Sequence, residues 1–105
     1  EKRLETIMKL LNCVRVGGRT LMTFWAYEQS NVRKRDMKWK RLRPTDTDYL
    51  IPWTDKYTNE VFQRFYHLYT EAEIHRLMED IAIANVVRSI QYCFECDNWV
   101  LILEK

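Results

Sequence analysis

The sequence predicts an α/β fold that closes with a C-terminal antiparallel hairpin, and three patterns support this prediction. An apolar stripe at helical spacing opens the chain, a helix with a complete N-terminal capping signal follows the middle, and two apolar runs separated by turn residues end it. At 105 residues the chain has room for one domain, which would bury only about two-thirds of its unfolded surface. We expect a single domain over residues 1–105, with an insertion at about residues 27–58.

The first predicted helix rests on apolar residues that recur every third or fourth position: Leu4, Ile7, Met8, Leu11 and Val14. Gly17 fits the left-handed position that follows the end of such a helix. Residues 19–26 form a continuous run of apolar, aromatic and β-branched side chains, which is typical of a strand buried on both faces of a parallel sheet. The pattern therefore predicts a helix that leads into a parallel strand.

The insertion shows no regular period, and Pro44 and Pro52 interrupt it as breakers. Residues 31–43 carry seven bases and one acid, whereas the rest of the chain carries ten bases and fourteen acids. Long irregular insertions are usually functional or disordered. We therefore expect a basic loop here.

The second helix has the best-marked start in the chain. Thr70 and Glu73 form a capping box, and Tyr69 and Ile74 form a hydrophobic staple. The helix should run to about residue 83. Its apolar stripe comprises Ile74, Leu77, Met78 and Ile81.

The last part of the chain predicts two strands, at residues 85–94 and 99–103, with turn residues between them that favour an antiparallel hairpin. Cys93 and Cys96 have CxxC spacing, but no second pair exists to complete a four-ligand zinc site. With Cys13 they make an odd set in a chain without a secretory signal. We interpret Cys93 and Cys96 as ordinary buried or turn cysteines and expect no metal.

Residues 62–69 are the richest candidate site, because five ring-bearing side chains and one arginine occur within them. In a strand, Arg64 and Tyr66 share one face while Phe65 and His67 lie on the other. A guanidinium beside a phenol, just before a helix N-terminus, suits an anionic group such as a carboxylate or phosphate. The residues alone favour a buried aromatic cluster past which Arg64 reaches water over a binding site.

Several separated segments together resemble one family: residues 15–18 (RVGG), 21–29 (LMTFWAYEQ), 51–53 (IPW), 64–67 (RFYH) and 97–105 (DNWVLILEK). In this order they are similar to the C-terminal half of the class I methyltransferases that esterify 5-carboxymethyluridine in tRNA, including the methyltransferase domain of the AlkB-homologue type. The resemblance implies the distal half of a Rossmann-like sheet, in which the final strand inserts antiparallel between the two before it. We expect the chain to be a fragment of such a domain.

The resemblance implies S-adenosylmethionine as the cofactor of the full enzyme. Cofactors bind such sheets at a glycine-rich turn after the first strand, and no GxGxxG pattern exists here. Gly17 and Gly18 follow a helix instead. We therefore expect no cofactor-binding residue in this chain and no cofactor binding or activity by the chain alone.

By resemblance, the catalytic residues are Arg64, which would orient the substrate carboxylate, and Tyr66, which would donate a hydrogen bond or stack on the base. The same resemblance leaves the role of Trp53 open. Trp25 would end its strand at the ligand-binding edge, although a core position suits it equally. His67 lies opposite Arg64, so we interpret it as a structural histidine.

The implied partner is the tRNA anticodon loop. We expect the basic insertion to contact RNA through Arg33, Lys34, Arg35, Lys38, Trp39, Lys40, Arg41 and Arg43. A solvated charge run is the competing interpretation.

The family also implies a small zinc-binding activator subunit, contacted through the half that this sequence lacks. The absence of a long apolar run indicates no membrane span and a cytoplasmic or nuclear protein. The alternative function is a non-catalytic module that binds RNA or protein.

Overall fold

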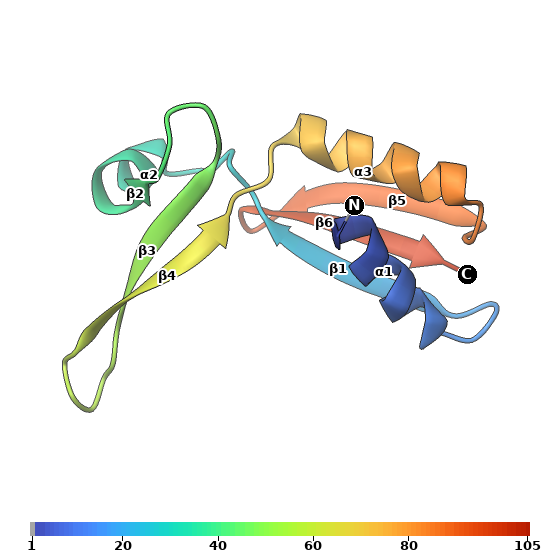
Figure 1. Ribbon diagram of the computed structural model, residues 1–105, viewed down its shortest axis with the longest axis horizontal. Helices are drawn as coiled ribbons and strands as arrows, with labels where there is room; N and C mark the ends of the chain where they lie inside the picture. Colours follow the sequence, from blue (N-terminus) through green and yellow to red (C-terminus); the bar gives the residue numbers. More distant parts are fainter. Residues whose placement is uncertain (1) are drawn as a thin grey trace.

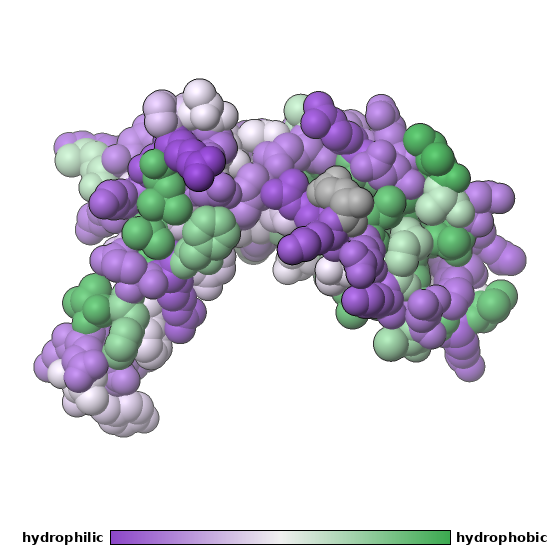
Figure 2. Space-filling model, in the orientation of Figure 1, coloured by the Kyte–Doolittle hydropathy of each residue, from purple (hydrophilic) through white to green (hydrophobic). Residues whose placement is uncertain are grey.

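Two small antiparallel sheets, each of three strands, form the two lobes of this protein in a computed structural model that describes residues 2–105 (Figure 1). The helix-backed lobe contains α1 (Lys2–Asn12), β1 (Arg19–Trp25), α3 (Glu71–Ala84), β5 (Ser89–Glu95) and β6 (Asn98–Glu104). The hairpin lobe contains α2 (Val32–Lys38), β2 (Lys40–Arg41), β3 (Asp48–Thr54) and β4 (Val61–His67). The lobes meet at one end and diverge, which gives the molecule an arched outline (Figure 2). The α/β class is therefore confirmed.

In the helix-backed lobe, β6 lies in the middle of the strand order β1-β6-β5 and runs antiparallel to both neighbours. This is the insertion of the final strand that the resemblance implied. The turn between β5 and β6 holds Cys96 at φ 52° and Asp97 at φ 62°, the left-handed pair that matches the twist of a two-residue hairpin. The predicted C-terminal hairpin is confirmed, although its first strand begins at Ser89 rather than residue 85.

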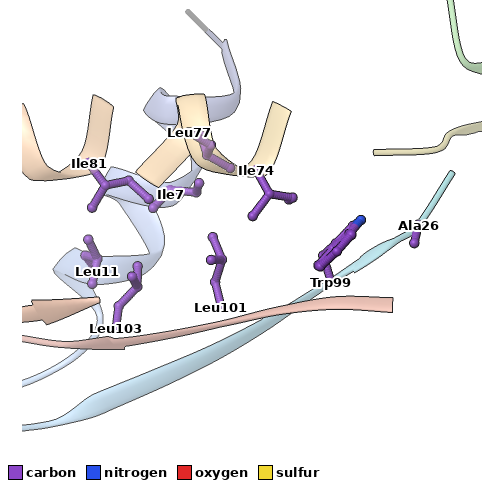
Figure 3. Packing of buried hydrophobic residues seen from close by; sticks show 9 residues of the cluster. All are labelled: Ile7, Leu11, Ala26, Ile74, Leu77, Ile81, Trp99, Leu101 and Leu103. Carbon is purple, nitrogen blue, oxygen red and sulfur yellow. The ribbon is translucent and has the colours of Figure 1, made fainter. Parts of the chain in front are cut away.

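The core of this lobe forms where α1 and α3 pack on one face of the sheet (Figure 3). Its buried members are Ile7, Leu11, Ala26, Ile74, Leu77, Ile81, Trp99, Leu101 and Leu103. The capping box of Thr70 and Glu73 is present at the start of α3, and the predicted apolar stripe faces the sheet. Both predictions for this helix are therefore confirmed.

The prediction of a doubly buried parallel strand at residues 19–26 is wrong for the described structure. β1 pairs antiparallel with β6, and its side chains alternate between exposed and partly buried. The helices of the lobe cover one face only, so Leu21 on the other face remains 62% exposed. β1 carries apolar side chains on both faces, so its sequence suggested that both faces are buried. Within residues 2–105, only one of them is covered.

The two glycines also differ from their predicted place. α1 ends at Asn12, and Gly17, at φ +85°, lies in the turn before β1 rather than directly after the helix. At Gly18 an added Cβ would lie 2.8 Å from Cγ1 of Val14, closer than real contacts allow. The Gly17 amide donates to the carbonyl of Lys105 at 2.8 Å, so this turn ties β1 to the end of β6.

The insertion is not irregular, because α2, β2 and β3 all lie within residues 27–58. Asn31 caps α2 by accepting a hydrogen bond from the Lys34 amide. Pro52 lies inside β3 rather than breaking it. β2 pairs with β3 only at Tyr49 and Leu50, so the edge of β3 is open at Pro52. Proline has no N–H to donate to a neighbouring strand, and an open edge tolerates this.

All three cysteines are free and exposed. Cys93 lies exposed in β5, so the expectation of a buried or turn cysteine is wrong there, whereas Cys96 lies in a turn as predicted. Cys93 shares the sheet face of Leu21, which the helices leave uncovered. Among residues 2–105, no helix is long and apolar enough to cross a membrane.

Thr70→Ala should lower the free energy of unfolding by about 1 kcal/mol, because the Glu73 amide loses its acceptor at the start of α3. Urea denaturation followed by circular dichroism measures this loss. Glu79→Ala, at an exposed position of the same helix, is the matched control and should change stability little. Equal stability of Thr70→Ala and the control would show that the cap does not hold the helix.

Candidate active site at the junction of the lobes

The chain passes between the lobes twice, and the two passages are hydrogen-bonded to each other. Ala26 and Tyr69 form a parallel bridge, in which the Tyr27 amide donates to the Tyr69 carbonyl at 2.9 Å and the Tyr69 amide donates to the Trp25 carbonyl at 2.8 Å. The carboxyl end of β1 is therefore fixed beside the residues that follow β4 (Figure 1).

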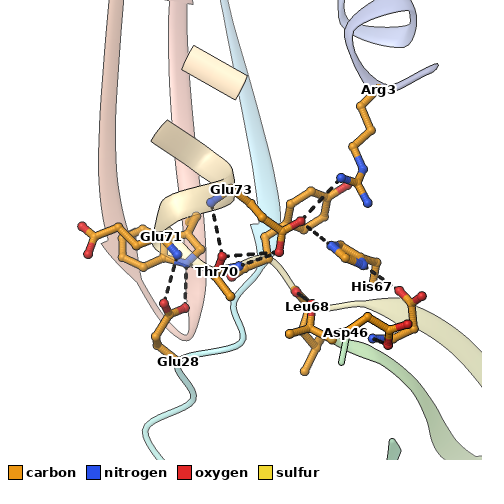
Figure 4. Close-up of polar contacts among 12 residues, drawn as sticks. Arg3, Glu28, Asp46, His67, Leu68, Thr70, Glu71 and Glu73 are labelled. Carbon is orange, nitrogen blue, oxygen red and sulfur yellow. Dashed lines mark hydrogen bonds and ion pairs between the residues drawn. The ribbon is translucent and has the colours of Figure 1, made fainter. Parts of the chain in front are cut away.

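His67 connects the lobes through its side chain (Figure 4). Its Nδ1 lies 2.6 Å from Oδ1 of Asp48 in β3, and its Nε2 lies 2.7 Å from Oε2 of Glu73 in α3. Arg3 of α1 pairs with the same Glu73 oxygen at 3.5 Å. Two carboxylates, one from each lobe, thus face the two ring nitrogens from opposite sides. Both ring nitrogens therefore have partners within the protein, and the structural role of His67 stays a prediction.

Asp48 and Glu28 take part in this junction, and no local signal in the sequence identified them. Asp48 reaches His67 because the two are cross-strand partners in the β3–β4 pair. Glu28 accepts a hydrogen bond from Nε1 of Trp99 at 3.1 Å and another from the Glu71 amide at 3.0 Å. Trp99 is buried, and its indole nitrogen is satisfied by Glu28 together with the Tyr69 carbonyl, which also accepts from it at 3.1 Å.

Trp25 ends β1 at its carboxyl edge, as predicted, and packs on two other aromatic rings. Its ring centroid lies 4.9 Å from that of Trp39 and 4.9 Å from that of Tyr66. An open depression of about 530 Å³ lies beside it and is lined by Thr23, Phe24, Trp25, Tyr66, His67, Tyr69 and Asn98. The junction thus brings Trp25, Tyr66 and His67 together at the carboxyl end of β1.

Arg64 lies farther out on the same strand and does not line this depression. The predicted alternation holds, because Tyr66 packs on Trp25 while His67 faces Asp48. The Arg64 guanidinium is exposed and lies over the ring of Trp53, 4.5 Å from its centroid. No side-chain hydrogen bond or ion pair holds Arg64 within residues 2–105, so its N–H groups face solvent.

The basic segment is a helix and a short strand rather than a loop. Its exposed cations are Arg33, Lys34, Lys38, Lys40, Arg41 and Arg43. Arg35 and Trp39, also predicted to contact RNA, are only 8% and 9% exposed. Arg35 donates to the Tyr27 carbonyl at 2.7 Å and lies 4.0 Å over the Tyr27 ring, so its contacts are internal. Trp39 packs with Tyr49 in the hairpin-lobe core and has no free face for a base.

Burial affects two ionisable groups in this core. Burial by itself would lower the pKa of Arg35, but its hydrogen bond to Asp36 and the nearby phenols raise it overall. Burial is the main reason that the pKa of Tyr49 is raised, and the charges of Arg41 and Arg35 oppose this effect. Both groups therefore keep their neutral-pH charge states, which suits a structural role.

The chain has measurable similarity to named proteins, although no family profile matches it. A Schizosaccharomyces pombe protein named tRNA (carboxymethyluridine(34)-5-O)-methyltransferase is 26% identical over 121 aligned residues, which cover 99% of this chain and 50% of the relative. A Xenopus tropicalis protein named tRNA (carboxymethyluridine(34)-5-O)-methyltransferase alkbh8 is 24% identical over 152 residues, which cover 100% of this chain and 24% of the relative. The resemblance is thus confirmed, at low identity, and the chain spans about half the length of the first relative.

His67→Ala should lower the free energy of unfolding by about 2 kcal/mol, because it removes two charge-assisted hydrogen bonds and leaves Asp48 and Glu73 without their shared donor. Thermal and urea denaturation measure the change. His75→Ala is the matched control, since the His75 side chain is 50% exposed and should tolerate the change. A His67→Ala protein as stable as the control would contradict a bridging role for His67.

Proposed function

We propose that this chain is part of a tRNA methyltransferase that esterifies the carboxylate of 5-carboxymethyluridine at the wobble position. The observation that carries the proposal is its similarity, over nearly its whole length, to two proteins whose names state that activity. The role in tRNA modification rests on those names, and the ester-forming chemistry is our inference from them. The names also imply S-adenosylmethionine as the methyl donor of the full enzyme.

We further propose that the helix-backed lobe is one end of a larger Rossmann-like sheet. Two features support this. β1 and β5 flank an antiparallel β6 and are thus parallel to each other, and β1 has no second neighbour among residues 2–105. The exposed Leu21 lies on the face that α1 and α3 leave uncovered. Further strands of such a sheet would pair the open edge, and its further helices would cover the bare apolar face.

The described residues do not fit a complete cofactor site. Gly17 and Gly18 lie at the amino end of β1, whereas cofactors bind such sheets at the carboxyl ends of strands. S-adenosylmethionine, held mainly by another part of the protein, would supply an electrophilic methyl group. The contribution that we assign to this chain is to bind and orient the acceptor carboxylate.

A carboxylate with a reference pKa near 4 is already ionised at neutral pH, so its methylation needs no strong general base. Positioning and exclusion of water then carry the reaction. Arg64 would hold one carboxylate oxygen through its solvent-facing N–H groups and leave the other oxygen free to attack. The neutral ester product loses this pairing and can leave.

Tyr66 would contact the base of the same substrate. Alternate residues of a strand are about 7 Å apart on one face, a span that a uracil ring and its carboxymethyl arm can bridge from Tyr66 to Arg64. Tyr66 also lines the junction depression, and no hydrogen bond occupies its hydroxyl within residues 2–105. The phenol can therefore stack on the base or donate a hydrogen bond to it.

The exposed cations of α2, β2 and Arg43 would contact tRNA phosphates. Each lysine or arginine that neutralises a phosphate releases counterions and adds affinity that depends on salt but not on sequence. We leave Arg35 and Trp39 out of this surface because they are buried. Contact with a small zinc-binding activator subunit, by the same resemblance, would involve another part of the protein.

A non-catalytic RNA-binding module is the second candidate. The position of Gly17 and Gly18 at the wrong end of β1 favours it, because the described chain then has substrate-binding groups without a glycine-rich cofactor turn. Methyl transfer by the protein that contains this chain separates the two candidates.

Arg64→Lys, in the intact protein, should cost more than roughly 1.4 kcal/mol of transition-state binding, which is a tenfold loss of kcat/KM. The ammonium group of lysine cannot reproduce the planar guanidinium, whose N–H groups would fix one oxygen of the substrate carboxylate. Methyl transfer to carboxymethylated tRNA under steady-state conditions measures the effect. Arg76→Lys, an exposed arginine on α3, is the control, and normal turnover and affinity in Arg64→Lys would remove Arg64 from the site.

Neutralising Lys34 and Lys38 together with glutamine should weaken tRNA binding and reduce the slope of log K against log salt by about 1 for each phosphate that is no longer neutralised. Turnover at saturating tRNA should remain nearly unchanged. Filter binding at several salt concentrations measures the slope. Lys9→Gln on α1 is the charge-matched control for a single change, and an unchanged slope in the double variant would place RNA elsewhere.

A further inference from the structure

The outer half of the β3–β4 hairpin exposes large rings on one face. Trp53 and Phe62 are cross-strand partners, with ring centroids 5.9 Å apart and planes tilted by 33°. They are 43% and 45% exposed. Apolar side chains interrupt the polar surface of this projecting hairpin at the lower left of Figure 2.

The hairpin does not need these rings for its own core. On the inner half of the same face, Tyr49 and Ile51 are buried with Trp39 and Leu68. Trp39, which lies between α2 and β2, packs on that half, and β2 ends its pairing with β3 at Tyr49 and Leu50. Beyond this point no element among residues 2–105 packs on the face that carries Trp53 and Phe62.

We propose that Trp53, Phe62 and Arg64 form a platform that stacks an unpaired base of an RNA loop. The inference rests on the proposed function, because the anticodon loop presents such bases. The Arg64 guanidinium lies over the Trp53 ring, 4.5 Å from its centroid, so the ring and the cation together would form one stacking surface. Unpaired RNA bases stack on aromatic rings and on guanidinium planes in this manner.

Charge on the hairpin lobe favours RNA over a protein partner. Residues 27–67 carry nine bases and six acids, whereas the rest of the chain carries eight bases and nine acids. Sites for single strands combine a positive surface that follows the phosphates with rings on which bases stack. α2, β2 and the hairpin provide both features in one lobe.

The test compares two RNA probes on the 105-residue chain by fluorescence anisotropy. One probe is an anticodon stem-loop with an unmodified wobble uridine, and the other is a fully paired duplex with the same number of phosphates. Trp53→Leu and Phe62→Leu remove a ring, Trp53→Phe keeps one, and Phe65→Leu is the control. Phe65 is 61% exposed on the opposite face of the same hairpin.

Trp53→Leu and Phe62→Leu should each weaken stem-loop binding by about fivefold or more, with an unchanged salt slope and unchanged duplex binding. Trp53→Phe and Phe65→Leu should bind nearly as the parent does. Equal loss on both probes, equal loss in Phe65→Leu, or no stem-loop binding by the parent would overturn the platform. So would self-association that Trp53→Leu abolishes without changing RNA affinity. The unmodified uridine cannot be methylated, so this result is separate from the Arg64→Lys test of methyl transfer.

Discussion

The parallel bridge between Ala26 and Tyr69, reinforced by His67, is the constraint on which the arrangement of the two lobes depends. Its backbone hydrogen bonds fix the end of β1 beside the start of α3. His67 then connects Asp48 in one lobe with Glu73 in the other. Glu73 also completes the capping box of α3, so the start of the helix and the junction share one carboxylate. A change at this residue should affect both.

The central position of β6 explains how so short a chain forms a core. A strand with a neighbour on each side shields its own backbone, and two of its side chains, Leu101 and Leu103, are fully buried. The helices complete one face only, which leaves apolar residues of β1 exposed on the other. This one-sided burial accounts for the failed prediction of a doubly buried strand, because the helices among residues 2–105 pack on only one face of β1.

The proposed site divides between two environments. Tyr66 lies in the junction depression among packed rings, whereas Arg64 lies on the open hairpin against Trp53. Under the two proposals, Arg64 would offer its N–H groups to an anion and its guanidinium face to a base, so charge pairing and stacking would act at the same residue. Under the proposed function, this division would assign substrate recognition to the hairpin lobe and structural support to the helix-backed lobe.

The sequence by itself determined the elements whose signals are local. The capping box and stripe of α3, the turn at Cys96 and Asp97, and the alternation through residues 62–69 were all predicted correctly, because each depends on residues within one or two turns of chain. The resemblance added the place of β6. Only the tertiary structure decided that residues 27–58 fold, since alternation there is masked by Pro52 and a basic helix. It also decided that Arg35 and Trp39 are buried and that Asp48 meets His67, because strand pairing and packing join residues that no local pattern connects.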